Sequence, residues 1–329
     1  MLEGYEPLEL STQLVIQEAL TRKIQVEVLD WEDNFIRLTR GSKVEYIKQA
    51  TKTSLDNYIA PLIMENKIVT KLVLKERGIR VPEGTVVHSV EEGIQLSARY
   101  LNQALVIKPK STNFGLGVSI LQNSYTEKEV KKALELAFQF ENSVLLEEYI
   151  AGKEYRILVI GDEVVAVLHR VPANVQGDDI HTILELVEEK NKDPLRGKGY
   201  VTPLEKLSLG ETEKEYLKMQ GLDIYNIPAL NKIVYLRENS NISTGGDSID
   251  FTDELHEGYK ELAVRAAKAA GARICGVDMM IQDIHKFPNN DSYGIIEINF
   301  NPALHIHNFP YRGKNRHAEK KVLDLLGFQ

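Results

Sequence analysis

The sequence predicts a mixed α/β protein of about two domains, and three observations support this. The chain has 329 residues, of which 43% are hydrophobic and 27% are charged, so it has enough material for two cores. Apolar runs typical of strands alternate along the chain with helices that begin at capping residues. Polar side chains recur at the ends of several predicted strands, which indicates a binding protein or an enzyme.

Composition excludes several classes of protein. The net charge is −8 with no basic block, which argues against a protein that coats nucleic acid but leaves room for local basic clefts that bind phosphate. No apolar run reaches the length of a membrane span, and there is no signal segment. The single cysteine, Cys275, excludes an internal disulfide and fits a reducing cytoplasm. We expect a cytoplasmic protein with small-molecule partners.

The first 60 residues predict a small N-terminal block. The pattern indicates an amphipathic helix over residues 8–21 and a strand over residues 24–29. Two further strands flank Arg40-Gly41-Ser42, which is typical of a hairpin turn. The block is small for an independent domain.

The next segment predicts a sheet with a glycine loop. A helix over residues 66–77 has Asn66 as its N-cap, and a buried strand over residues 104–109 carries Lys108 near its end. The polar loop 111–117 follows. Such a loop can fold over phosphates because glycine lets backbone N–H groups approach oxygen atoms closely. An ordinary hairpin has the same composition, and the loop fits neither the P-loop nor the dinucleotide fingerprint.

The middle of the chain combines strands with a long irregular segment. The strand over residues 144–150 ends in two acids and an aromatic residue, and a hairpin over residues 154–170 turns at Gly161-Asp162. Residues 171–231 are irregular, as expected of a lid, a substrate loop or a contact surface. The loop 238–247 is rich in small donors and glycines, which suits anion binding, although turns share this composition.

The strongest local pattern lies in residues 294–302. Side chains on a strand alternate between faces, so Glu297, Asn299 and Asn301 share one face. An upstream apolar run, residues 274–281, contains the single carboxylate Asp278. Oxygen ligands of this kind suit Mg²⁺. The alternative is an edge strand with a solvated polar face.

Taken in order, these features resemble the ATP-grasp superfamily of carboxylate–amine ligases over about residues 62–310. The resemblance implies an α/β (α+β) fold in which two subdomains with mostly antiparallel sheets enclose ATP. The expected division is a short block over residues 1–61, a small subdomain with the glycine loop over 62–148, and a C-terminal subdomain with the metal site over 149–329.

The resemblance also implies residue roles. The implied nucleotide-binding residues are Lys71, Lys108, Ser111, Gly115, Gly117, Glu147, Tyr149, Ile150 and Glu154. Among them the two lysines would hold phosphates, Glu147, Tyr149 and Ile150 would contact adenine, and Glu154 would contact ribose. The implied metal ligands are Asp278, Glu297 and Asn299, for two Mg²⁺ ions with Mn²⁺ as a substitute. Arg237 and Lys108 are the implied catalytic residues, and the expected substrate contacts are Arg170, Asn241, Ser243 and Asn301.

A closer resemblance is to the C-terminal ligase module of bacterial bifunctional γ-glutamylcysteine/glutathione synthetases, through residues 26–38, 48–71, 241–252 and 300–316. Cyanophycin synthetase is similar through residues 156–181 and 240–252. We therefore expect a ligase that joins γ-glutamylcysteine to glycine. The alternatives are another ATP-grasp peptide ligase and a nucleotide-binding module without catalysis. The γ-glutamylcysteine ligase module is absent, so the chain is either an excised module or a lone descendant. The resemblance leaves open two protein partners, a separate γ-glutamylcysteine ligase module and a second copy of this chain in a homodimer.

Overall fold

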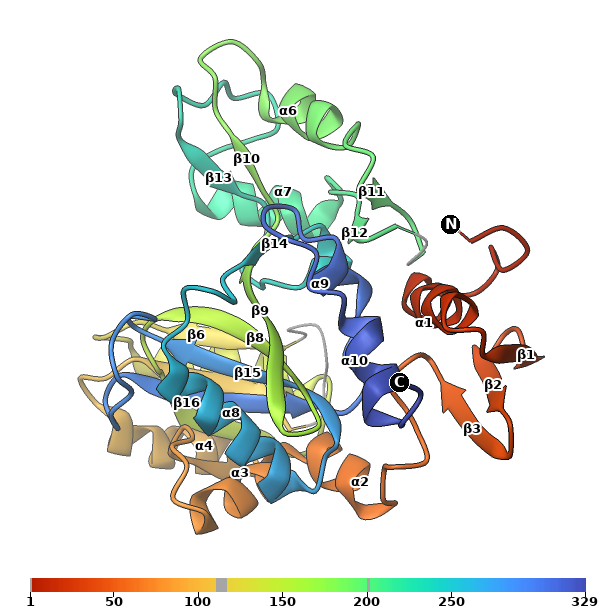
Figure 1. The fold of residues 1–329 in the computed structure, drawn as a ribbon. Helices are drawn as coiled ribbons and strands as arrows, with labels where there is room; N and C mark the ends of the chain where they lie inside the picture. The colour runs from red at the N-terminus through yellow and green to blue at the C-terminus, as the bar shows by residue number, and fades with distance from the viewer. Residues whose placement is uncertain (1, 111–116, 200–201) are drawn as a thin grey trace.

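The computed structural model describes residues 2–110, 117–199 and 202–329 (Figure 1). In these residues the strands form a three-stranded, a four-stranded and a five-stranded sheet, together with two short two-stranded ladders. No helix in the described ranges is long and apolar enough to cross a membrane.

The N-terminal block is one helix on a small antiparallel sheet of order β1-β2-β3. Its elements are α1 (Leu10–Thr21), β1 (Gln25–Asp30), β2 (Phe35–Arg40) and β3 (Lys43–Lys48). The predicted turn at Gly41 is confirmed, because Gly41 adopts a positive φ of 62° between paired strands. The block shares a core with the C-terminal helix α10 (Ala318–Leu325) and with one face of the five-stranded sheet. It is therefore packed into the rest of the molecule.

The segment of residues 59–148 contains an antiparallel sheet of order β4-β7-β5-β6. The helices of residues 90–97 and 127–138 pack on this sheet, whereas the helices of residues 59–76 pack in the core of the five-stranded sheet. Its elements are α2 (Ile59–Glu65), α3 (Lys67–Glu76), β4 (Gly84–Val87), α4 (Val90–Ser97), η1 (Ala98–Tyr100), β5 (Leu105–Pro109), β6 (Ser119–Leu121), α5 (Glu127–Phe138) and β7 (Val144–Glu148). Asn66 caps α3 as predicted, since its side chain accepts hydrogen bonds from the backbone of Ile68 and Val69. The sequence did not reveal α2, which is only 7 residues long.

The largest sheet has the order β14-β9-β8-β15-β16, and all its pairings are antiparallel. Its elements are β8 (Lys153–Ile160), β9 (Glu163–Val171), β14 (Asp247–Asp250), β15 (Ile274–Ile281) and β16 (Tyr293–Asn299). Helix α8 (Glu257–Ala270) covers one face and ends at Gly271. The N-terminal block covers one end of the other face, at Leu158, Ile160 and Ile274. Because β15 lies inside the sheet and is buried along most of its length, its sequence is almost continuously apolar.

Residues 171–236 form an insertion with its own small core, seen at the top of Figure 1. Its elements are β10 (Asn174–Gln176), α6 (Ile183–Lys190), β11 (Arg196–Gly197), β12 (Leu204–Glu205), α7 (Glu211–Met219) and β13 (Ile233–Tyr235). The short helices η2 (Ile242–Thr244) and α9 (His305–Asn308) lie outside this segment. Asp247 of β14 anchors the insertion, because its carboxylate pairs with the buried Arg196 and with Lys190.

Phe328 provides a test of the contact between the two chain ends. Its ring is fully buried in the core that the N-terminal block shares with α10. Phe328→Ala should lower the free energy of unfolding by about 3–5 kcal/mol, because it removes a large buried side chain and leaves a cavity. Phe287→Ala is the matched control, since Phe287 is 70% exposed, and it should change stability by less than about 0.5 kcal/mol. Urea unfolding followed by circular dichroism measures both, and equal effects would contradict this packing.

Candidate active site

A cleft of about 1540 Å³ lies between the four-stranded and the five-stranded sheets. Its walls include Lys108 and Glu147 from one sheet and Glu154, Asp278 and Glu297 from the other. The volume exceeds the roughly 300–1,000 Å³ of most small-molecule sites. The cleft can therefore hold more than one ligand at once.

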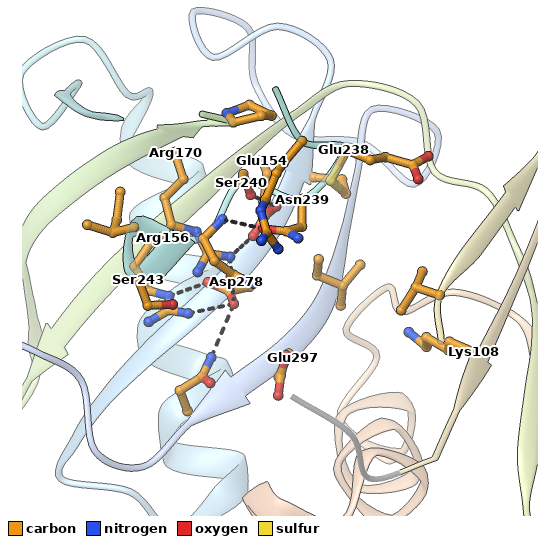
Figure 2. A pocket seen from close by; sticks show the side chains of 18 of the residues that line it. Lys108, Glu154, Arg156, Arg170, Glu238, Asn239, Ser240, Ser243, Asp278 and Glu297 are labelled. Atoms are coloured by element: carbon orange, nitrogen blue, oxygen red, sulfur yellow. Dashed lines mark hydrogen bonds and ion pairs between the residues drawn. The ribbon is translucent and has the colours of Figure 1, made fainter. Parts of the chain in front are cut away.

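The wall formed by the five-stranded sheet is organised around Asp278. The strand register places Asp278 directly opposite Arg156 of β8 on one side and Glu297 of β16 on the other. The side chain of Arg156 binds both carboxylate oxygens, with Nη2 2.8 Å from Oδ2. Arg170 Nη2 and Asn299 Nδ2 each donate to the same Oδ2 at 3.2 Å (Figure 2). Burial by itself would raise the pKa of Asp278, but Arg156 and Arg170 lower it below its ordinary value.

A glycine makes room for this arrangement. A Cβ atom on Gly276 would lie 2.8 Å from Cδ of Arg156, which is closer than real Cβ contacts allow. The arginine side chain of β8 therefore occupies the space over β15 that a side chain at position 276 would fill. Sequence reasoning did not identify Arg156 as a site residue, because its place beside Asp278 depends on the pairing of two strands that are far apart in the chain.

Arg170 links two of the acids in the cleft. Its Nη2 atom pairs with Glu154 as well as with Asp278, and Glu154 also accepts a hydrogen bond of 2.6 Å from Ser240 Oγ. Figure 2 shows these side chains gathered at one end of the cleft, with Lys108 on the opposite wall. The predicted ribose acid and the predicted metal acid are thus joined through one guanidinium group.

The three predicted metal ligands come together on adjacent strands. Glu297 lines the cleft, and Asn299 donates its amide N–H to Asp278, which leaves the amide oxygen available. In the described part of the chain no three acids, histidines or cysteines are grouped closely enough to hold a metal by themselves. Two carboxylates and an amide oxygen nevertheless fit a hard divalent cation, which usually binds one or two carboxylates plus ligand oxygens.

Two lysines meet at Glu147 on the opposite wall. Glu147 is 2% exposed, and its two oxygens pair with Lys71 and, at 2.8 Å, with Lys108. Burial would raise the pKa of Glu147, but the two ammonium groups lower it. Burial also lowers the pKa of Lys71 to about 8, with Lys108 acting in the same direction. Because Lys71 lies behind Glu147, it does not line the cleft.

Lys67 does line the cleft. It lies four residues before Lys71, on the same face of α3, and burial lowers its pKa while the charge of Glu297 acts against that shift. The phosphate role of Lys71 stays a prediction. Lys67 is a second candidate on the same face of α3, which sequence reasoning did not name for the site.

The remaining predicted residues lie in several places. Tyr149, Ile150, Asn241, Ser243 and Asn301 line the cleft. Gly117 is buried with a φ of 72°, whereas Ser111 and Gly115 lie outside the described residues. Arg237 also lines the cleft, but its Nε atom donates to Glu213 of the insertion at 2.5 Å. The guanidinium groups in contact with Asp278 are those of Arg156 and Arg170.

Comparison with known proteins agrees with this geometry. An ATP-grasp-like domain model matches residues 6–59, and a RimK-like ATP-grasp domain model matches residues 64–191. The glutathione biosynthesis bifunctional protein GshAB of Clostridium perfringens is 58% identical over 99% of this chain and 42% of its own length. The chain belongs to the ATP-grasp ligases. The Listeria innocua GshAB protein is 50% identical, again over 99% of this chain and 42% of its own length.

A solved structure supports the same membership. The crystal structure of a bifunctional glutathione synthetase from Pasteurella multocida has a TM-score of 0.79 and 50% identity, covering 99% of this chain and 45% of that one. This ATP-grasp chain thus spans less than half the length of these relatives. The predicted family and fold are confirmed, and use of ATP with a divalent metal follows from the family. The residue roles stay predictions.

The two lysines of α3 can be separated experimentally. Lys67→Met should raise the KM for ATP about tenfold, since Lys67 is at the cleft wall. Lys71→Met should lower the free energy of unfolding by about 1–3 kcal/mol, because Glu147 would stay buried with one lysine in place of two. Steady-state kinetics and urea unfolding of both variants measure these effects. A higher KM for ATP in Lys71→Met, together with lower stability in Lys67→Met, would assign the phosphate role to Lys71.

The buried histidines of α9 predict acid sensitivity. Burial lowers the pKa of His307 to about 3, and both its ring nitrogens lack a partner among the described residues. The unfolded chain binds a proton near pH 6.5 but the folded chain does not, so stability is complete above pH 6.5 and is lost as pH falls toward 3. The slope should reach about 1.4 kcal/mol per pH unit for this histidine.

His307→Leu should reduce that slope between pH 6 and pH 4 in urea unfolding measured at stepped pH. His181→Gln is the control. Its exposed ring pairs with Asp178, which raises the pKa of His181, so both states are protonated in this range and the slope should persist. An unchanged slope in His307→Leu would show that other groups cause the acid sensitivity, such as His305 and His169, whose pKa values burial lowers to about 4.

Proposed function

We propose that this chain joins γ-glutamylcysteine to glycine with hydrolysis of ATP to ADP and phosphate, which forms glutathione. The observation that carries the proposal is the match of 58% identity over 99% of the chain to a relative named for glutathione biosynthesis. The site supports a ligase of this kind, because one cleft is lined by cations, by candidate metal ligands and by hydrogen-bond donors for an acid substrate.

In the first step, a carboxylate oxygen of the acid substrate attacks the γ-phosphorus of ATP, and the bond to the bridging oxygen of ADP breaks. The protein contributes position and charge in such a transfer. Lys108 and Lys67 neutralise phosphate oxygens from one wall, and Arg156 acts from the other, beside Asp278. The sequence predicts that Arg237 contacts the transferred phosphate. Its guanidinium group can do so after it leaves Glu213.

The metal ligands in this proposal are Asp278, Glu297 and Asn299. They would hold two Mg²⁺ ions, for which Mn²⁺ could substitute. The ions would supply positive charge to the phosphate oxygens. Asp278 already lies among three donors, so its carboxylate is held at a fixed place on the sheet for this task.

In the second step, the amine of glycine attacks the acyl carbon and phosphate leaves, with loss of a proton from the nitrogen. An acylphosphate hydrolyses in water, so the cleft must exclude solvent. The insertion supplies Tyr216, Met219 and Tyr235 to the cleft, and we assign it the role of a cover. The substrate carboxylates meet Arg170, Asn241, Ser243 and Asn301.

The proposal has consequences for partners and location. The acid substrate must come from a γ-glutamylcysteine ligase activity, which is consistent with the word bifunctional in the names of the relatives. A reducing cytoplasm suits a thiol substrate. A homodimer stays a proposal that size-exclusion chromatography can test.

Phosphate release from Mg-ATP tests the function directly. The acid panel is γ-glutamylcysteine, γ-glutamylaminobutyrate, D-alanine and an aspartyl peptide, each with and without glycine. We expect release only with a γ-glutamyl dipeptide plus glycine. Glu297→Ala should lower kcat/KM at least about 10³-fold, because it removes a candidate metal ligand. Glu189→Ala is the control, since that side chain is 71% exposed, and it should retain full activity.

Release with a different acid and amine would keep the mechanism and change the substrate. Saturable binding of ATP without release for any pair would contradict the ligase proposal and favour a nucleotide-binding module. Activity retained in Glu297→Ala would remove that residue from the metal site.

A further inference from the structure

A tight turn at the end of β3 adopts an unusual backbone conformation. Lys48 and Lys52 exchange backbone hydrogen bonds of 2.9 and 3.1 Å across it. Between them, Gln49 and Ala50 have positive φ angles of 52° and 66°, although neither is glycine. Side chains with a Cβ atom rarely adopt this left-handed conformation, and it persists only where the surroundings enforce it. Two such residues in succession call for an explanation.

The turn holds one side chain of the cleft. The hydroxyl of Thr51 donates to Oδ1 of Asn301 at 2.8 Å, and Nδ2 of Asn301 donates to Oε1 of Gln49 at 3.3 Å. Thr51 is fully buried. Asn301 lines the cleft just after the strand that carries Glu297 and Asn299. Both ends of its carboxamide are therefore held by residues from the N-terminal block.

Lys52 decides the orientation of these groups. Its ammonium donates to Oε1 of Gln49 at 2.7 Å and lies 5.2 Å from the centre of the Phe300 ring. An ammonium can only donate, so the atom of Gln49 that faces it must be the oxygen. That oxygen can only accept, so Asn301 must present its NH₂ group to Gln49 and its oxygen to Thr51. The order of donors fixes the carboxamide of Asn301 in one of its two possible orientations.

Among the described residues, one N–H of Asn301 remains without a partner after these contacts. We propose that Gln49, Thr51 and Lys52 are positioning residues that hold Asn301 so that this N–H donates to an oxygen of the acid substrate. The inference rests on the proposed function, in which Asn301 contacts substrate. It gives the N-terminal block a part in substrate affinity, although in the described ranges no residue before Leu62 lines the cleft.

Thr51 offers a matched set of variants. Thr51→Val keeps the shape and removes the hydroxyl, whereas Thr51→Ser keeps the hydroxyl. Thr51→Val should raise the KM for the acid substrate about tenfold, as expected for one misplaced hydrogen bond, with kcat and the KM for ATP within about twofold of the wild type. Thr51→Ser should restore the wild-type KM. Ala50→Gly is the control for backbone strain, because it relaxes the turn and removes one buried methyl group without removing a contact to Asn301, and its kinetics should match the wild type.

The double variant Thr51→Val/Asn301→Ala adds a further criterion. It should have the same KM as Asn301→Ala alone, because Thr51 acts through Asn301. A fully additive KM, an unchanged KM in Thr51→Val, or an equal loss in Thr51→Ser would overturn the proposal.

A measurement on the side chain itself separates this inference from the proposed function. The Asn301 carboxamide signals can be assigned in a ¹H–¹⁵N spectrum of the full chain by their loss in Asn301→Ala. Thr51→Val should shift or double those signals, and Thr51→Ser should leave them near their wild-type positions. If no substrate pair gives product, this spectrum still decides the case. Unshifted signals in Thr51→Val would overturn the positioning role.

Discussion

The arrangement of this protein depends on the neutralisation of one buried carboxylate. Asp278 is 2% exposed on the face of the five-stranded sheet that lines the cleft, and an isolated charge buried to this extent is very unfavourable. Arg156 and Arg170 meet this requirement from neighbouring strands. The pairing fixes the register of β8, β9 and β15 and brings Glu297 and Asn299 to the same end of the cleft.

On the opposite wall of the cleft, a buried carboxylate is again neutralised by cations of the protein itself. There, a buried glutamate lies between two lysines that come from a helix and a strand. Each wall thus contains at least one acid whose partners are the protein's own cations. Because these cations are held close to the cleft at a fixed place, little reorganisation is needed when an anionic ligand enters. When an anionic ligand binds, its oxygen atoms can replace the protein carboxylates as partners of these cations.

The parts outside the two sheets are tied to the cleft through polar contacts. The N-terminal block holds the segment after β16, since Ser11 Oγ accepts from the backbone of Leu304 and Thr51 donates to Asn301. The insertion is held at Asp247 by Arg196, which also donates to the backbone oxygen of Gly245 in the loop beside the cleft. Both parts influence the shape of the site. The insertion has an apolar core of its own, and the N-terminal block shares its core with the five-stranded sheet.

Local patterns in the sequence determined many of the elements, whereas most of the candidate site residues were implied by the resemblance to the ATP-grasp ligases. The cap at Asn66 depends only on neighbouring residues, and the structure agrees with it. The predicted strand in residues 294–302 is also present, and it ends at Asn299. Only the tertiary structure placed Lys67 at the cleft, Arg156 beside Asp278, and Gln49 with Thr51 against Asn301. These contacts join residues up to 252 positions apart, or depend on which face of a helix is packed. Periodicity and capping encode the conformation of a segment, whereas strand register and packing across the whole core decide which side chains meet.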